Sequence, residues 1–424
     1  MLKAVTDSAR FKKILISAYA ISPYLGSEFG VGWNFVTRLS GHYDVTVLYG
    51  TSGGKMGNNS EMLDYIQRNG SAGVHYVYVR PNLLVSFFDW LNRKVNPLFF
   101  AFAYPFWQVQ VLVAARELVK NGKYDLVHQL NGMGFRNPGF LWKLAIPFVW
   151  GPVGGTSNLN SIFFALLSKG NYVRHVIRNV SNRYFLGFSP SIRNAARASS
   201  AIFCATRADR DNFRRWLNVE CPVIRENSVI KYASSIKKTG SHLNFVWVGR
   251  VDELKALNLL IEAVARLGRP EAWTLHVVGG GPVKEKCMAM SHALGVAEQI
   301  VWHGSVKREQ VLEIMGDSDV HIITSLMESL PTVLLEAFEM CVPTIALDQF
   351  GMSDLIDADV GFKIEVTTLD DIVRKLALCL DYCLDNPIVL DGMKSLILQR
   401  QGELHWDVTI QQTREIYERV LAND

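Results

Sequence analysis

The chain has 424 residues, of which 49% are hydrophobic and 20% charged, so it can bury large cores and is not intrinsically disordered. At roughly 100–200 residues per domain, this length predicts two domains or three. The formal net charge of +4 is too small to indicate nucleic-acid binding, and we expect no nucleic-acid partner.

The N-terminal segment, residues 1–13, lacks the apolar stretch of about 7–15 residues that marks a secretory signal. No apolar run reaches the roughly 18 residues of a membrane-spanning helix. The nearest approach is PLFFAFAYPFW (97–107), which is too short and contains two prolines. We therefore expect a cytoplasmic protein with no spanning helix.

Short apolar runs recur through the first half of the chain and alternate with helical patterns. They are KKILISAYA (12–20), YDVTVLYG (43–50), VHYVYV (74–79), YDLVHQL (124–130), PFVWGPV (147–153) and SAIFCAT (200–206). Runs rich in β-branched and aromatic residues, without clean alternation, suit strands that are buried on both faces, as in parallel sheets.

A glycine-rich segment, SPYLGSEFGVGWN (22–34), directly follows the first of these runs. Gly26 and Ser27 can offer backbone N–H groups to a phosphate. The segment is not a Walker loop, because no Gly-Lys-Ser/Thr follows, and it is not a clean G-x-G-x-x-G fingerprint.

Two later segments of the first half combine aromatic and basic character. Residues 82–113 are rich in aromatic side chains, with Arg93 and Lys94 between apolar stretches, and residues 169–215 hold ten Lys/Arg against two acids. Basic charge beside aromatic residues suits an interface with anionic lipid. The alternative is that these are core helices with a solvated basic face.

The polar segment NSVIKYASSIKKTGSH (227–242) has weak periodicity and predicts a linker between a first domain, residues 1–226, and a second, residues 243–395. The apolar runs of the second half are NFVWVGR (244–250), WTLHVVGG (273–280), IVWHGS (300–305), DVHIITS (319–325) and PTIAL (343–347). Helical patterns lie between them. The repeated alternation predicts an α/β fold of two doubly wound, Rossmann-like domains facing across a cleft, with ligands at the carboxyl ends of the strands.

Cationic residues follow the first strand of the second half, in GRVDELKALNLL (249–260). Gly249 and Arg250 close the strand, and Lys255 opens the predicted helix. A cation at a helix N-terminus opposes the helix dipole, so it needs another reason to be there. A bound diphosphate would supply one, since Arg forks onto phosphate oxygens and Lys adds a point charge. The alternative is a pair of ordinary surface cations.

Glycines follow the next strand, in VVGGGP (277–282). Gly280 and Gly281 would let the backbone approach a ligand, although a simple tight turn explains them equally well.

Two carboxylates frame the segment MESLPTVLLEA (327–337). Glu328 is expected in the loop after a strand, and Glu336 lies within the helix that Pro331 begins. The first-turn N–H groups of this helix form an anion site, and the carboxylates suit ligands rich in hydroxyl groups. The alternative is that Glu328 caps the helix and Glu336 is solvated.

Taken together, GR…K (249–255), GGGP (279–282) and ESLPTVLLE (328–336) resemble the retaining nucleotide-sugar glycosyltransferases of family 4, which have the GT-B fold. The pieces GSEFGVGW (26–33), DLVHQL (125–130) and PFVWGPVGG (147–155) are similar to a bacterial subgroup that builds surface polysaccharides. LHWD (404–407) resembles the start of the family's closing segment, so residues 396–424 are expected to form a helix that crosses back to the first domain.

The resemblance implies a role for each matching residue. Glu328 would hold hydroxyls of the donor sugar, and Glu336 the ribose of the nucleotide. Arg250 and Lys255 would bind the diphosphate and stabilise the leaving group. The remaining donor-binding positions would be Gly26, Ser27, Gly249, Gly280, Gly281, Ser329, Leu330, Pro331 and Thr332.

His128 is the expected catalytic histidine, because many family members place a histidine near the reacting carbon in the loop after the corresponding strand. One alternative stays open. His128 can be a core histidine of the strand, in which case a backbone or water group takes its role.

The resemblance implies a hexosyltransferase that uses a UDP- or GDP-sugar as substrate and no cofactor. No Asp-x-Asp motif stands in a strand-end loop, so no metal site is expected; Arg250, Lys255 and helix N-termini would stabilise the departing diphosphate. No carboxylate nucleophile stands out, and the resemblance favours same-face attack with retention of configuration.

The expected acceptor is a saccharide, lipid-diphosphate-linked in surface polysaccharide, O-antigen or exopolysaccharide synthesis, bound by the first domain at the inner face of an anionic membrane. Competing interpretations are a nucleotide-sugar epimerase of the same fold and a catalytically inactive donor-binding protein. A phosphorylase would need a pyridoxal-phosphate lysine and a much longer chain.

Overall fold

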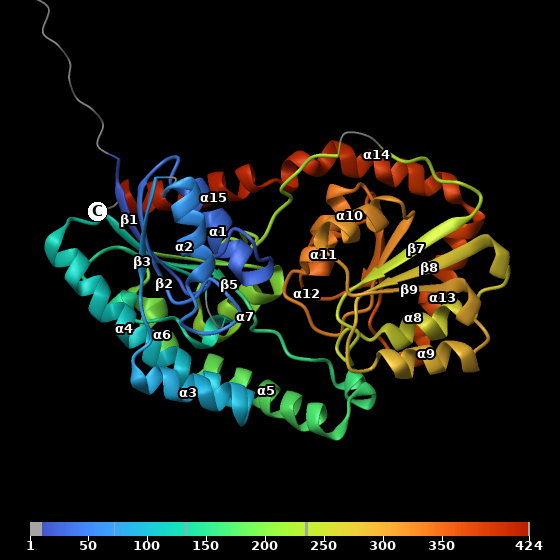
Figure 1. The fold of residues 1–424 in the computed structure, drawn as a ribbon, viewed down its shortest axis with the longest axis horizontal. Helices are drawn as coiled ribbons and strands as arrows, with labels where there is room; N and C mark the ends of the chain where they lie inside the picture. The colour runs from blue at the N-terminus through green and yellow to red at the C-terminus, as the bar shows by residue number, and fades with distance from the viewer. Residues whose placement is uncertain (1–10, 72, 132–133, 234–235, 423–424) are drawn as a thin grey trace, which may run out of the picture.

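The computed structural model describes residues 11–71, 73–131, 134–233 and 236–422. The first ten residues, part of the segment in which no secretory signal is expected, lie outside this range. Two parallel six-stranded sheets, each covered by helices, form the two halves of the molecule (Figure 1). The predicted α/β architecture of two doubly wound domains is therefore confirmed.

The first sheet has the strand order β3-β2-β1-β4-β5-β6. Its strands are β1 (Lys13–Ala18), β2 (Asp44–Tyr49), β3 (Val74–Tyr78), β4 (Leu126–Asn131), β5 (Phe148–Val153) and β6 (Ala201–Cys204). Its helices are α1 (Ser27–Leu39), α2 (Ser60–Asn69), α3 (Leu83–Lys94), α4 (Phe100–Asn121), α5 (Lys169–Phe188), α6 (Pro190–Ala198) and α7 (Arg207–Leu217). Each of the six predicted runs forms one of these strands.

The second sheet has the order β12-β11-β10-β7-β8-β9. Its strands are β7 (Leu243–Val248), β8 (Trp273–Val278), β9 (Ile300–Gly304), β10 (Val320–Ile323), β11 (Thr344–Leu347) and β12 (Gly361–Ile364). The helices that follow are α8 (Leu257–Val264), α9 (Lys284–Ala293), α10 (Arg308–Gly316), α11 (Thr332–Glu339), α12 (Phe350–Leu355), α13 (Leu369–Asp385), α14 (Pro387–Leu404) and α15 (Trp406–Ala422). Strand β12 was not among the predicted runs, because this short edge strand contains a glycine and a lysine and has no continuous apolar run.

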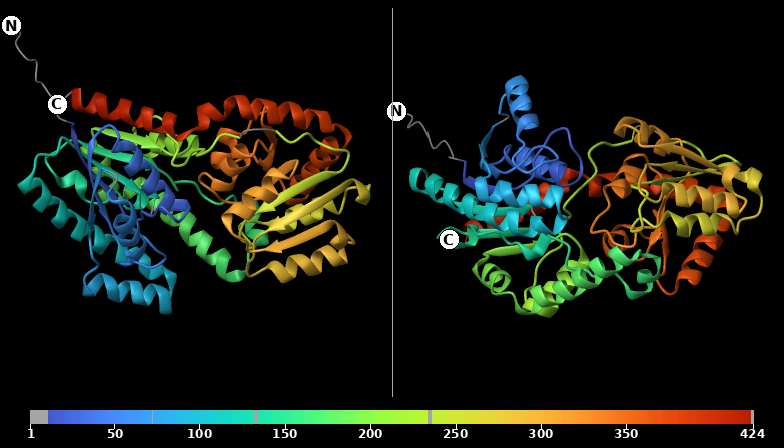
Figure 2. Two further views of the ribbon diagram at one scale, coloured as in Figure 1. Left: turned by 45° about the horizontal axis from the view of Figure 1, so that its top comes forward. Right: turned by 60° about the horizontal axis from the view of Figure 1, so that its bottom comes forward.

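The chain crosses between the domains at its C-terminal end, at a point after residue 396. Helix α14 packs on the second domain and α15 on the first (Figure 2). The crossing point is His405, where the backbone of Val229 in the linker accepts from Trp406 and donates to Leu404. Because α14 is continuous to Leu404, only α15 joins the core of the first domain.

A segment of the first domain also enters the second. Leu159 and Phe163, around the short helix η4 (Ser161–Leu166), belong to the hydrophobic cluster of the second domain. Phe163 is fully buried there. The predicted domain of residues 1–226 therefore contributes one internal segment to the other domain's core.

Helix α5 has the reverse of the usual polarity of a surface helix. Its outward face carries an apolar stripe beside the exposed Arg174 and Arg183. The stripe consists of Tyr172, Val173, Val176, Ile177, Val180, Tyr184 and Phe188, which are all exposed, by 37–70%. Its inward face carries polar residues instead, with His175 and Asn182 buried and Arg178 half-buried. A surface helix normally turns its apolar stripe toward the core. The outer face of α5 is thus suited to an apolar environment.

Candidate functional site

The loops after β7 and β10, which are neighbouring strands, lie against each other at the carboxyl end of the second sheet. The hydroxyl of Thr324 donates to the carbonyl of Lys255 at 2.7 Å, and the N–H of Leu326 donates to the carbonyl of Leu254 at 2.7 Å. These bonds bring the side chains of Lys255 and Glu328 together as an ion pair. Two of the predicted site residues, 73 positions apart, therefore meet.

Lys255 does not open a helix, as the sequence predicted, but lies in the turn that precedes α8. The side chain of Asp252 organises this turn by accepting from the N–H groups of Leu254 and Lys255, each at 3.0 Å. The other carboxylate oxygen of Asp252 binds Nε of Arg250 at 2.8 Å. Burial lowers the pKa of Lys255, whereas the side chain of Arg250 is 71% exposed. Lys255 is therefore the more enclosed of the two cations.

The glycines of 279–281 hold the loops after β7 and β8 in contact. A Cβ at Gly279 would lie 1.9 Å from the carbonyl oxygen of Gly249, and one at Gly281 would lie 2.3 Å from that of Val251. The N–H of Val251 donates to the carbonyl of Gly280 at 3.0 Å. The need for glycine thus comes from the close approach of two backbone segments, whether or not a ligand is bound.

Pro331 is the N-cap residue of α11, in line with the sequence prediction. Ser329 and Leu330 precede it, and the hydroxyl of Thr332 accepts from the amide of Asn227 in the linker at 3.1 Å. The first-turn N–H groups of α11 therefore lie where the second domain meets the linker and the first domain. This is the anion-binding end of a helix dipole.

Glu336 and Glu328 belong to separate networks. Glu336 accepts from Nε of Arg308 at 2.8 Å, and Arg308 also approaches Glu339 at 3.7 Å. Burial raises the pKa of Glu336. The two glutamates of the motif consequently have different partners, Lys255 for Glu328 and Arg308 for Glu336.

A cavity of about 390 Å³ lies in the cleft between the two domains. Its lining includes Ser27, Glu28, Gln129, Arg136, Gly154, Gly155, Arg178, Glu226, Asn227, Ser329, Leu330 and Thr332. Of the predicted donor-binding residues, Ser27, Ser329, Leu330 and Thr332 therefore border one space. Gly26 is the N-cap of α1 and directly precedes Ser27, whose φ of 55° is unusual for a residue other than glycine.

Two carboxylates of this cavity, Glu28 and Glu226, were missed by the sequence analysis. Glu226 lies close to Ser329 and Leu330, beside Gly154. Partial burial in the cleft raises the pKa of the Glu226 carboxyl from 4.5 to about 7, and the neighbouring Asp209 and Glu28 add to this. The pKa of Glu28, whose side chain is more exposed, is raised in the same direction by its surroundings. Only the position of Glu226 directly before the predicted linker could have drawn attention to it.

These raised pKa values predict a pH-dependent stability. Between about pH 4.5 and 7 the folded protein holds more protons than the unfolded chain, so the contribution of these carboxyls to stability falls as the pH rises through this window. Glu226→Gln should therefore gain stability relative to wild type between pH 5 and pH 8, measured by urea unfolding. The exposed Glu298→Gln serves as the control. A stability difference for Glu226→Gln that does not change with pH would contradict the prediction.

His128 does not reach the cavity, which corrects the expectation that it is catalytic. It is fully buried in β4, where Nε2 lies 2.7 Å from the carbonyl oxygen of Gly151 and Nδ1 lies 2.6 Å from the hydroxyl of Tyr417. Nε2–H donates to the carbonyl and Nδ1 accepts from the tyrosine, which requires the neutral imidazole. Burial accordingly lowers the pKa of His128 to about 4. The histidine attaches α15 to the first sheet, so the core alternative holds.

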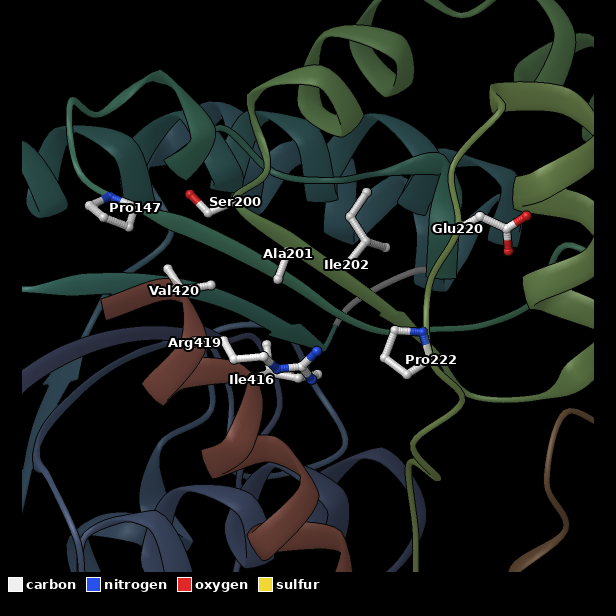
Figure 3. A pocket seen from close by; sticks show the side chains of 9 residues that line it. All are labelled: Pro147, Ser200, Ala201, Ile202, Glu220, Pro222, Ile416, Arg419 and Val420. Carbon is white, nitrogen blue, oxygen red and sulfur yellow. The ribbon is translucent and has the colours of Figure 1, made fainter. Parts of the chain in front are cut away.

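A second groove runs along the edge strand β6, beneath α15 (Figure 3). It is lined by Pro147, Ser200, Ala201, Ile202, Glu220, Pro222, Ile416, Arg419 and Val420. Pro147 and Ser200 precede β5 and β6, at the amino ends of these strands. Ligands of doubly wound sheets bind at the carboxyl ends, so the interdomain cavity is the better candidate.

Among the residues that the structure describes, no three His, Cys, Asp or Glu side chains are grouped to hold a metal ion. The charged groups around the predicted diphosphate position are Arg250, Lys255 and the first turn of α11. Metal independence stays a prediction.

Comparison with known proteins finds relatives of the second domain and of the overall fold. Residues 232–382 match the family described as "Glycosyl transferases group 1". The lipopolysaccharide 1,6-galactosyltransferase of Salmonella typhimurium is 30% identical over 138 residues, which cover 31% of this chain and 38% of that protein. The chain thus spans well under half the length of this curated relative.

Solved structures match over almost the whole chain. The lipopolysaccharide outer core galactosyltransferase WaaB, in its apo form, has a TM-score of 0.65 at 16% identity and covers 96% of this chain and 99% of its own. Anabaena HepE in complex with UDP has a TM-score of 0.58 at 14% identity and covers 96% and 100%. Such identities show the fold alone, and the fold of this chain is GT-B.

Proposed function

We propose that this protein is a retaining glycosyltransferase that moves a hexose from a UDP- or GDP-sugar to a saccharide acceptor during surface polysaccharide synthesis. The observation that carries the proposal is the ion pair of Lys255 with Glu328, which directly precedes Ser329, Leu330 and the first turn of α11, the residues that line the cavity between the two domains. The match of residues 232–382 to group 1 glycosyltransferases supports the same function.

The arrangement suits departure of a nucleoside diphosphate. Lys255 and the N–H groups of α11 are fixed donors that stabilise the charge developing on the leaving group without reorganising. Glu328, beside Lys255, is placed for hydroxyls of the donor sugar. We propose that the departing phosphate assists deprotonation of the acceptor on the same face of the sugar, which retains the configuration.

Turnover of a panel of UDP- and GDP-sugars tests this function. Without acceptor, slow hydrolysis should release the sugar with its original anomeric configuration, observed by NMR before mutarotation. The rate should be the same in EDTA, because protein cations neutralise the diphosphate. Interconversion of two nucleotide sugars would favour an epimerase, and binding without any turnover would favour an inactive donor-binding protein.

The separate networks of the two glutamates predict separate effects. Glu336→Gln should weaken UDP or GDP binding through the ribose, whereas Glu328→Gln should leave nucleotide binding intact or tighten it, because Lys255 is freed from its ion pair. Turnover of the full donor should fall in Glu328→Gln. Calorimetry with free nucleotide, together with rate measurements, checks both, and identical nucleotide affinities for the two variants would contradict the assignment.

We also propose that the first domain docks on an anionic membrane through the outer faces of α3, α4 and α5. Among the described residues, no helix combines the length and apolarity needed to cross a bilayer. Helices α3 and α5 lie along the lower side of the first domain in Figure 1. Phe87, Trp90 and Phe102, on α3 and α4, are each about half exposed, at 53%, 49% and 53%. With the apolar stripe of α5 they form a surface suited to lipid.

Liposome sedimentation tests the docking. The double variant Ile177→Ser and Val180→Ser, on the outer face of α5, should bind vesicles of anionic phospholipid more weakly. Leu378→Ser with Ile388→Ser, exposed apolar residues of the second domain, is the matched control. Arg214 is a poor target for charge reversal, because it already pairs with Glu220 at 2.8 Å. If both double variants sediment with vesicles to the same extent as wild type, the α5 stripe is not the site of attachment.

A further inference from the structure

Two arginines line the first-domain wall of the interdomain cavity without a carboxylate partner. Arg136 comes from the short helix η2 (Gly134–Arg136), and Arg178 from the inner face of α5. The Nε atoms of both are buried and have no hydrogen-bond partner. Within the described part of the chain, neither guanidinium forms an ion pair, whereas most other arginines near acidic groups do.

The contacts that Arg136 and Arg178 do make hold them in place without neutralising them. A terminal nitrogen of Arg136 donates to the side-chain oxygen of the buried Asn182, and it lies 3.4 Å from the backbone carbonyl of Arg178. Asn182 in turn donates to the carbonyl of Ser157 at 3.0 Å, which fixes the loop after β5. The guanidinium of Arg178 makes no hydrogen bond in the described structure. One cation is thus clamped and the other is free to bind.

Keeping these two charges together is unfavourable in the absence of an anion. Burial lowers the pKa of both arginines. A neighbouring cation lowers each pKa further, Arg178 that of Arg136 and Arg174 that of Arg178. The other titratable group on this face, His175, is buried with Nδ1 unpartnered. Among the described residues, Glu226 forms no ion pair with either arginine. The cavity therefore has a cationic part and a separate acidic part that borders Ser329.

We propose that Arg136 and Arg178 bind a diphosphate group of the acceptor, at a second anion site distinct from the donor site at Lys255 and α11. This inference rests on the proposed glycosyltransferase function and deepens it by naming the acceptor class. Two guanidinium groups suit a group with two or more negative charges better than a single carboxylate, and their planar forks match phosphate oxygens. The acceptor sugar would then extend toward Ser329, one of the predicted donor-binding residues, which lines the same cavity.

The same helix favours a lipid as the source of this diphosphate. Arg178 points into the cavity from the inner face of α5, while Ile177 and Val180, its neighbours in sequence, are 57% and 62% exposed on the outer face. A lipid diphosphate bound at Arg178 would therefore have its hydrocarbon tail beside the apolar stripe of α5. A sugar phosphate in solution offers the same diphosphate or phosphate chemistry without the tail.

Calorimetry on the full-length protein tests the site in two arms. In the first arm, UDP and GDP are titrated to establish the donor site. In the second arm, inorganic pyrophosphate is titrated into protein saturated with the nucleotide that binds. Wild type should bind one further pyrophosphate, and Arg178→Gln should bind it at least tenfold more weakly with unchanged nucleotide affinity. Arg183→Gln, an exposed arginine on α5, is the matched control, and Arg178→Lys should weaken binding less than Arg178→Gln.

Farnesyl diphosphate in place of pyrophosphate assigns the source of the ligand. Tighter binding of farnesyl diphosphate than of pyrophosphate supports a lipid-linked acceptor, and equal binding supports a soluble phosphate through the same arginines. Pyrophosphate binding that is lost on saturation with nucleotide, or that Arg178→Gln leaves unchanged, overturns the proposal. Binding of glucuronate in preference to pyrophosphate also overturns it.

A failure of the proposed function is distinguishable from a failure of this inference. If neither UDP nor GDP binds wild type, the donor site is wrong, and pyrophosphate titrated into nucleotide-free protein still reports on Arg178. Arg178→Gln should fold normally, because the side chain of Arg178 makes no hydrogen bond in the described structure. As a second measurement, pyrophosphate should raise the unfolding temperature of nucleotide-saturated wild type, and no rise would count against the site.

Discussion

Lys255→Ala should weaken binding of UDP or GDP more than any other single change at the donor site. A charged hydrogen bond contributes about 1.5–3 kcal/mol, which corresponds to at least tenfold in affinity. Removal of Lys255 also leaves the carboxylate of Glu328 without its partner, facing the incoming diphosphate. Arg250→Ala should cost less, because Arg250 is more exposed and is already paired with Asp252.

The double variant Lys255→Ala with Glu328→Gln separates these two effects. If repulsion from Glu328 adds to the lost contact, the double variant should bind free nucleotide more tightly than Lys255→Ala alone. Arg266→Ala is a suitable control, because Arg266 forms only an exposed pair with Asp370. Calorimetry that finds wild-type nucleotide affinity in Lys255→Ala would remove the diphosphate assignment.

Phe163→Ala should lower the free energy of unfolding by about 3–5 kcal/mol, the usual cost of truncating a buried phenylalanine. Phe163 belongs to the first half of the chain but fills a place in the core of the second domain. The change therefore leaves a cavity in one domain and loosens its attachment to the other. Turnover should fall together with stability, because the cleft is no longer held in one geometry.

Chemical unfolding in urea measures this effect, and the adjacent Phe164→Ala is a matched control. Phe164 is only partly buried and packs against Tyr172 at the start of α5, so its removal should cost clearly less. Near-equal costs for the two variants would show that Phe163 does not join the domains. Small-angle scattering tests the loosening of the cleft separately. An unchanged shape of Phe163→Ala would contradict the loosening but not the predicted loss of stability.

A polar contact between the domains also fixes the position of α5 relative to the donor loop, the segment of residues 250–255 after β7. Glu253, between Arg250 and Lys255 in sequence, accepts from the N–H of Ser168 at 2.9 Å and from the amide of Asn171 at 2.7 Å. The donor loop of the second domain thus binds the N-terminus of the helix that carries Arg178. This contact joins the proposed donor and acceptor sites.

Local sequence pattern was sufficient for every strand except β12 and for the beginning of α11. Buried parallel strands need continuous apolar runs, and Pro331 favours the start of a helix. Each of these features therefore depends on residues that are adjacent in the sequence. The edge strand β12 escaped because an edge position does not require such a run. The placement of Lys255 and Glu328 in adjacent loops followed from the order of strands that a doubly wound fold imposes.

The tertiary structure alone decided the roles of His128, Phe163 and Arg178. A strand sequence shows which side chains point to opposite faces of the sheet, but not which element covers each face. His128 is covered by α15, through Tyr417, which lies 289 residues further along the chain. Phe163 enters the other domain, and Arg178 turns inward on a helix whose outer face is apolar, against the usual polarity. Each of these depends on contacts between distant segments, whose energies no short window of sequence contains.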